Sequence, residues 1–262
     1  MLVALLAAAL GGCSDYHYHA GRLDEGRRRG PDALKHYEAF LARRPADPRA
    51  AELHVRSGWI YAGMDRCLEA RRHFEAAARE FPKAEPWAAR ALAGVTSCPD
   101  YFPLSPGRSW VYGDSASGGK AMRLEWRVDA SSGAGAAMTQ TLFAGAKKLS
   151  ATQVDYEWAS WKLWQREKGG RFEVLPYPFV AGSRWTARRD DKVLEYRVER
   201  DDAVVKTVAG TFRDCLKVRE SDPGYREAWK YDYYCPSVGR ALTTVAGPDF
   251  ENPNTELLSY SR

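Results

Sequence analysis

The spacing of apolar residues changes near residue 99, and this change constrains the fold more than any other feature. Residues 122–129 alternate strictly, with charged residues between Met122, Leu124, Trp126 and Val128. A period of two is typical of a strand with one buried face. Residues 15–97 have a helical period instead, and no helical stretch separates the strands that follow. The chain therefore predicts an α+β multidomain fold, with helices first and an antiparallel sheet second.

A stretch rich in proline and glycine separates the two regions. Residues 100–107 read DYFPLSPG, a composition that interrupts regular structure. We expect a helical domain over 13–98 and an antiparallel all-β domain over 99–262, since 262 residues suffice for two cores. Aromatic residues make up 12% of the chain, which suits β structure that packs large rings. A β-sandwich is the expected form of the second domain.

The first twelve residues predict export. Residues 2–10, LVALLAAAL, are too few to span a bilayer, which takes about 20 residues, but they suit the core of a signal peptide over 1–12. Leu10-Gly11-Gly12-Cys13 resembles the lipobox of bacterial lipoproteins, which implies that Cys13 carries lipid. Ser14 after it implies the outer membrane, on either face. The alternative is an ordinary signal peptide with a chance cysteine, and a basic segment before the apolar run is missing.

Four cysteines remain to form disulfides in the oxidising compartment that export implies. Four cysteines allow three pairings. Proximity in the expected architecture favours Cys67–Cys98 in the helical domain and Cys215–Cys235 across a β-hairpin, with four buried thiols as the alternative. No histidine follows His73, so a Cys/His zinc site in the second half is unsupported. We expect no metal and no cofactor.

The helical domain repeats at an interval of 37 residues. The stretch 31–45 aligns with part of 67–82, which places Tyr37 on Phe74 and Pro45 on Pro82. The pattern resembles helix B of a tetratricopeptide repeat. Ser57-Gly58-Trp59-Ile60-Tyr61 resembles helix A of that family, with serine in a leucine position. The resemblance implies one complete repeat at 51–84, a degenerate one at 14–47 and a capping helix at 86–97.

The same resemblance implies a concave, partner-binding surface on helix A. Its residues in the complete repeat are Glu52, Val55, Trp59 and Ala62, with the Trp59 ring as anchor for a partner's peptide. The alternative is that Trp59 packs inside the protein. His17 and His19 alternate with tyrosines near the N-terminus, but two histidines are weak evidence for a metal site, so we expect a tether or a first helix there.

The β region carries ordered motifs of its own. Phe102-Pro103-Leu104-x-x-Gly107-x-x-Trp110 recurs as Tyr177-Pro178-Phe179-x-x-Gly182-x-x-Trp185. Further along stand Gly210-x-Phe212-x-x-Cys215-Leu216-x-Val218 and Tyr234-x-Pro236-x-Val238-Gly239. Together these resemble a β-domain of bacterial secreted proteins and lipoproteins over about 100–262. The resemblance brings no known activity.

Chemistry is sparse in this sequence. It has no P-loop, G-x-G-x-x-G, G-x-S-x-G or H-E-x-x-H motif, and all five histidines precede residue 74. The net charge of +5 arises from 39 basic and 34 acidic residues, without a basic arm for nucleic acid. Trp229, Tyr231 and Tyr233 share a strand face that could line a groove, although core packing is the better interpretation.

We therefore expect a membrane-anchored adaptor of the bacterial envelope without enzymatic activity. It would bind an envelope protein through the helical repeats, as part of a larger envelope, appendage or secretion assembly. The alternative is a carrier of a lipid or small apolar ligand in the β-domain. A continuous apolar cavity of several hundred Å³ would favour the carrier.

Overall fold

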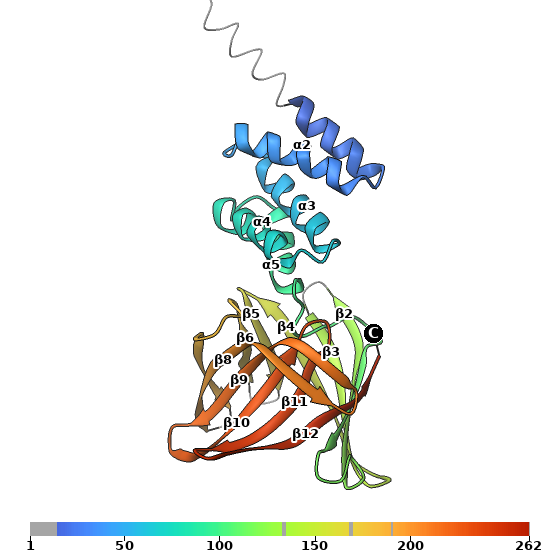
Figure 1. The fold of residues 1–262 in the computed structure, drawn as a ribbon, viewed down its shortest axis with the longest axis vertical. Helices are drawn as coiled ribbons and strands as arrows, with labels where there is room; N and C mark the ends of the chain where they lie inside the picture. Colours follow the sequence, from blue (N-terminus) through green and yellow to red (C-terminus); the bar gives the residue numbers. More distant parts are fainter. Residues whose placement is uncertain (1–14, 133–134, 168–169, 190, 262) are drawn as a thin grey trace, which may run out of the picture. The chain divides into compact units, whose positions relative to one another are not determined.

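The chain divides into two compact units, residues up to 98 and residues from 99 onward. The structure is a computed structural model that describes residues 15–132, 135–167, 170–189 and 191–261 (Figure 1). Each unit has its own core and is described by itself.

The first unit consists of short helices joined by tight turns. Residues 15–26 are helical, and α2 (Gly30–Arg43), α3 (Ala50–Ala62), α4 (Cys67–Glu80) and α5 (Trp87–Ser97) follow. Pro31 fits the first turn of α2, where its missing N–H would have no helical partner. Arg28 and Asp65 adopt φ values of 60° and 57° in the turns before α2 and α4. These two turns are 37 residues apart, like the sequence repeat.

Glycines allow aromatic rings of one helix to lie against the backbone of the next. A Cβ atom on Gly58 would lie 2.4 Å from the ring of Phe74, and one on Gly21 would lie 2.5 Å from the ring of Tyr37. Both rings are fully buried. The two glycine–ring pairs are also 37 residues apart. The sequence repeat therefore corresponds to a repeated packing contact between neighbouring helices. Membership of the tetratricopeptide class stays a prediction.

Both predicted disulfides form. Cys67–Cys98 links the start of α4 to the residue after α5, and Cys215–Cys235 links two neighbouring strands. The sequence separations are 31 and 20 residues. In the chain-entropy model, closing loops of this size stabilises the folded state by roughly 3–4 kcal/mol each.

The second unit is one antiparallel sheet of 12 strands. Its order is β6-β5-β4-β3-β2-β1-β12-β11-β10-β9-β8-β7. The end strands β6 and β7 lie close together, so the sheet curls into a nearly closed, barrel-like form (Figure 1). The strands are β1 (Ser109–Asp114), β2 (Met122–Ser132), β3 (Gly135–Ala144), β4 (Lys147–Ala159), β5 (Lys162–Glu167), β6 (Gly170–Pro176), β7 (Arg184–Arg189), β8 (Lys192–Thr207), β9 (Gly210–Asp222), β10 (Tyr225–Cys235), β11 (Gly239–Gly247) and β12 (Phe250–Tyr260).

The expected fold class, α+β multidomain, is wrong. Strands dominate the described chain, and the helices form only a short N-terminal group. The expected β-sandwich is also wrong, because a sandwich packs two sheets and these strands pair in one continuous order. Alternation along a strand reports only that one face is buried. It cannot tell a sheet that covers a second sheet from a sheet that curls around its own interior.

The predicted alternation in β2 is confirmed. Trp126 and Val128 are buried in the interior of the sheet, whereas Arg127 and Asp129 form an ion pair of 2.8 Å on the other face. Large side chains from many strands fill the same interior. The interior of the curled sheet is therefore the core of this unit.

Two of the sequence motifs pack against each other although about 130 residues separate them. The indole N–H of Trp110 donates to the carbonyl of Val238 at 2.6 Å. A Cβ atom on Gly239, whose φ is +92°, would lie 3.5 Å from Pro103 and 3.6 Å from Trp110. Arg108 donates to the carbonyl of Ser237 at 2.8 Å. These motifs therefore join the start of β1 to the turn between β10 and β11, which is a structural role.

Gly58→Ala is expected to destabilise the helical unit by about 1–3 kcal/mol, the usual cost of overpacking. The added methyl group would overlap the Phe74 ring, which is held between Gly58 and Gly94. Urea unfolding followed by circular dichroism measures the change. Gly63→Ala is the control, because its nearest contacts would be 3.5 Å away. Equal effects of the two substitutions would contradict this packing role.

Candidate functional site

A cavity of about 120 Å³ lies in the interior of the β unit. Side chains from β2 to β11 line it, because the curled sheet surrounds the space. Aromatic rings such as Trp126, Tyr156 and Tyr196 share the wall with charged groups. The charged residues of the wall are Glu173, Arg189, Glu220, Lys230, Asp232 and Arg240.

Asp232 is the centre of a charged cluster in this wall. The Nζ atom of Lys230 lies 3.0 Å from Asp232 Oδ2 and 2.9 Å from Glu220 Oε2. The hydroxyl of Thr243 donates to Asp232 Oδ1 at 2.6 Å, and Arg240 Nη1 lies 3.9 Å from the same oxygen. Residues on β10 and β11 thus meet at the Asp232 carboxylate, and Lys230 links it to Glu220 on β9.

The cluster keeps its members charged. Burial by itself would raise the pKa of Asp232, but attraction to Lys230 and Arg240 outweighs burial and the pKa lies below its ordinary value. Burial would likewise lower the pKa of Lys230, yet Asp232 and Glu220 hold that pKa above its ordinary value. Asp232 and Lys230 are therefore both charged at neutral pH, and each needs the other because unpaired buried charge is costly.

Arg240 extends the cluster across the interior. Its guanidinium carbon lies 4.4 Å from the centroid of the Trp126 ring and 5.3 Å from that of Tyr112. Stacking on aromatic faces suits the flat guanidinium group. The contacts connect β11 with β2 and β1, so the charged cluster is built into the core of the β unit.

Two polar atoms in this wall have no partner among the described residues. Glu173 Oε2 accepts a hydrogen bond from Lys162 at 2.6 Å, but the buried Oε1 of the same carboxylate accepts none. The buried indole N–H of Trp126 donates to no atom. A buried polar group without a partner costs roughly 1–3 kcal/mol. A polar molecule that meets either atom would remove that cost.

This cavity does not suit the apolar carrier considered from the sequence. That hypothesis needs a continuous apolar space of several hundred Å³. The interior holds about 120 Å³ and its wall carries ionised side chains. A lipid chain in this space would remove water from the charged groups without replacing its hydrogen bonds, which is unfavourable. The structure therefore argues against a lipid in the interior of the β unit.

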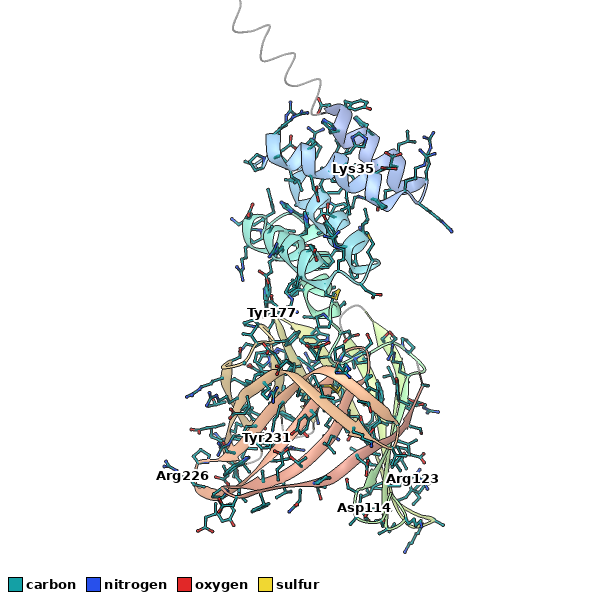
Figure 2. All side chains as sticks on the ribbon, viewed as in Figure 1. Lys35, Asp114, Arg123, Tyr177, Arg226 and Tyr231 are labelled. Atoms are coloured by element: carbon teal, nitrogen blue, oxygen red, sulfur yellow. A yellow bond between two sulfur atoms is a disulfide. The ribbon has the colours of Figure 1, made fainter. Side chains whose placement is uncertain are left out.

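The charged residues of β10 were missed from the sequence, whereas the rings between them were noticed. Trp229, Tyr231 and Tyr233 alternate with Lys230 and Asp232 along β10 and therefore lie on its opposite face. Tyr231 is labelled in Figure 2. Cations cover two of these rings: Arg219 lies 3.9 Å from the Trp229 centroid and Lys217 lies 4.0 Å from that of Tyr231. The alternation of aromatic and charged residues along this strand could have indicated two different faces. The alternation alone does not say which of the two faces is buried.

The predicted partner-binding residues of α3 do not form one open surface. Glu52 accepts hydrogen bonds from Arg22, Arg56 and Tyr18 within the unit. Val55 is 1% exposed and belongs to an apolar cluster. Ala62 is half-buried, and Trp59 alone is well exposed, at 44%. Helix packing uses Glu52 and Val55 internally, which corrects the expected four-residue groove.

Histidines form two equivalent pairs in the helical unit. The Nδ1 atoms of His17 and His36 lie 3.0 Å apart, and those of His54 and His73 lie 3.1 Å apart. Burial lowers the pKa of both His54 and His73 to about 4. The described residues include no group of three or more potential metal ligands from His, Cys, Asp and Glu.

The predicted lipidation residue, Cys13, lies outside the described residues. Within the part of the chain that the structure describes, no helix has the length and apolar character needed to cross a membrane.

Comparison with known proteins yields likeness of structure only. No family model and no curated protein matches the chain. A Bacteroides fragilis protein provisionally described as exported, with a YmcC-like fold, is 17% identical, with a TM-score of 0.42 over 62% of this chain and 98% of that one. A provisionally described lipoprotein of Parabacteroides distasonis is 14% identical, with the same score and coverage. A hypothetical protein of Chlamydia trachomatis is 8% identical, with a TM-score of 0.33 over 60% and 88%. Function is therefore argued from this chain's own residues.

Lowering the pH from about 6.5 toward 4 is expected to weaken the helical unit. The unfolded chain protonates His54 and His73 near the ordinary value of 6.5, whereas the folded chain resists until about 4. Stability from the neutral pair is therefore complete above 6.5 and is lost as the pH falls. Urea unfolding at several pH values, followed by circular dichroism, measures this slope. The variant that combines His54→Gln with His73→Gln should flatten it, and an unchanged slope would contradict the assignment.

Proposed function

We propose that this chain is a non-enzymatic lipoprotein of the bacterial envelope whose β unit holds a small polar molecule in its interior. The observation that carries the proposal is that two buried atoms in the cavity lining have no partner among the described residues, Glu173 Oε1 on β6 and Trp126 Nε1 on β2. The neighbouring charges are already paired with one another around Asp232. They make the lining of the cavity polar, which favours a polar guest over an apolar one.

The size and polarity of the cavity limit the guest. A cavity of about 150 Å³ holds a molecule as large as benzene, so about 120 Å³ suits a molecule of a few heavy atoms. The guest must donate a hydrogen bond to Glu173 and accept one from Trp126. Small amides and the shortest amino acids have both groups, and we therefore take acetamide and glycine as probes.

Binding of acetamide or glycine to the full chain is expected to depend on Glu173. Glu173→Gln removes the charge and gives the site a donor where the guest's own donor points, so affinity should fall about tenfold or more. Isothermal titration calorimetry measures the binding. Glu125→Gln is the matched control, because Glu125 lies on the other face of β2 and pairs with Arg123.

Three results would refute the interior site. They are no saturable binding of either probe, equal binding by the Glu173→Gln variant, or a high-resolution structure in which water alone occupies the cavity in the presence of both probes. Equal loss in the Glu125→Gln variant would also count against it.

The envelope location rests on the N-terminal sequence and on the disulfides. From the lipobox resemblance we infer that Cys13 carries lipid. From Ser14, which follows it, we infer sorting to the outer membrane. Disulfides persist in oxidising compartments, so Cys67–Cys98 and Cys215–Cys235 suit an exported protein.

A second function, binding of an envelope protein by the helical unit, is favoured by one observation. Trp59 exposes 44% of its surface on α3, and Met64 just beyond the same helix is 41% exposed. Exposed aromatic side chains are common anchors of protein interfaces. The adaptor hypothesis therefore rests on Trp59 and its surroundings.

Trp59→Ala is expected to reduce recovery of a co-purifying envelope protein about tenfold or more. The measurement is quantitative mass spectrometry of proteins captured with the chain from detergent-solubilised membranes. Leu68→Ala is the control, since Leu68 is an exposed apolar residue on α4. The ring also touches Phe74 edge to face at 5.0 Å. Loss of folding in the Trp59→Ala variant would assign the ring to the core and refute the anchor.

A further inference from the structure

A row of arginines crosses three strands on the outer face of the β unit. The register pairs Arg184 of β7 with Arg197 of β8, and Arg197 with Arg219 of β9. Their sequence neighbours Val198 and Val218 are buried in the interior, so the arginines project from the other face. Like charges directly opposite each other on neighbouring strands destabilise a sheet. A carboxylate or a bound anion near this row would therefore relieve the repulsion between the arginines.

The chain neutralises this row only in part. Arg197 lies 3.7 Å from Glu199, and Arg219 stacks on Trp229. Arg184 and Arg219 form no ion pair with any described residue, and the buried Nε of Arg219 has no hydrogen-bond partner there. The exposed guanidinium group of Arg184 thus keeps its N–H donors available to an anion, and the charge of Arg219 is not neutralised by a described carboxylate.

The row forms part of a surface pocket of about 630 Å³. A second row lies beside it in the same register: Thr186 pairs with Glu195, and Glu195 pairs with Ser221. All three of these residues line the pocket. Arg226, near the start of β10, adds a fourth guanidinium group to the wall (Figure 2).

We propose that this pocket binds a phosphate ester that carries a hydroxyl or ammonium group. Guanidinium groups bind phosphate oxygens through paired, charge-assisted hydrogen bonds, and three in-register strands spread them over about 10 Å. The adjacent row offers the Glu195 carboxylate and the hydroxyls of Thr186 and Ser221, which accept hydrogen bonds from hydroxyl or ammonium groups. The site lies on the outer face of the sheet and shares only Tyr196 with the lining of the interior cavity.

Soluble phosphate esters and lipid headgroups share this chemistry, and the test separates them. The full chain with Cys13→Ser is used, so that lipid on Cys13 cannot carry it to a membrane. Calorimetry with sn-glycerol 3-phosphate and phosphoethanolamine reports on soluble esters. Co-sedimentation with phosphatidylglycerol vesicles, compared with phosphatidylcholine vesicles, reports on headgroups. Glycerol without phosphate is the ligand control.

Arg184→Gln and Arg219→Gln are each expected to weaken binding about tenfold or more in whichever arm is positive. Arg213→Gln is the matched control, because Arg213 is exposed on β9 outside the pocket. Circular dichroism checks that each variant folds, and the edge-strand position of Arg184 keeps that variant informative if Arg219→Gln misfolds. Binding of soluble esters supports a free ligand, and binding of phosphatidylglycerol vesicles alone supports a headgroup.

The proposal is overturned if no phosphate ester and no vesicle binds. It is also overturned if glycerol binds as well as its phosphate, if both arginine variants bind like the unaltered chain, or if Arg213→Gln weakens binding equally.

Discussion

The curling of a single antiparallel sheet into a nearly closed form is the constraint on which the β unit depends. Each of the 12 strands sends alternate side chains into one interior, so residues distant in sequence must fit the same small space. Much of that space is filled by rings, but the wall of its cavity carries the ion pair between Asp232 and Lys230. The pair is stable there because Glu220, Arg240 and Thr243, from two neighbouring strands, complete its contacts.

The two candidate binding sites of the β unit are consequences of the same alternation. On β9, Glu220 faces the interior cluster, whereas its neighbour Arg219 belongs to the outer arginine row. One strand therefore lines a small polar cavity on one face and a wider pocket with four arginines on the other. As proposed, the interior site would select its guest by size and hydrogen bonding, and the outer site by charge.

The helical unit was easier to anticipate because its contacts are local. The 37-residue interval identified Tyr37 and Phe74 as equivalent, and both rings are buried against a glycine of the preceding helix. Proximity in the expected architecture also favoured the two disulfides that form. The surface of α3 was harder, since Glu52 is held by Arg22 from the first helix and Val55 packs in a cluster with Ala77 and Ala91. Periodicity does not report such partners.

The sequence by itself determined where helices give way to strands and which strands alternate, because both are set by residues near one another along the chain. It favoured the two cysteine pairings that form, without excluding the others. Only the tertiary structure decided that the strands form one curled sheet and not a sandwich. It also decided that charged Lys230 and Asp232, and not the rings between them, face the interior cavity. The physical reason is that a buried charge is tolerable only beside its partners, and Glu220 and Arg240 reach Asp232 and Lys230 only once the strands have paired.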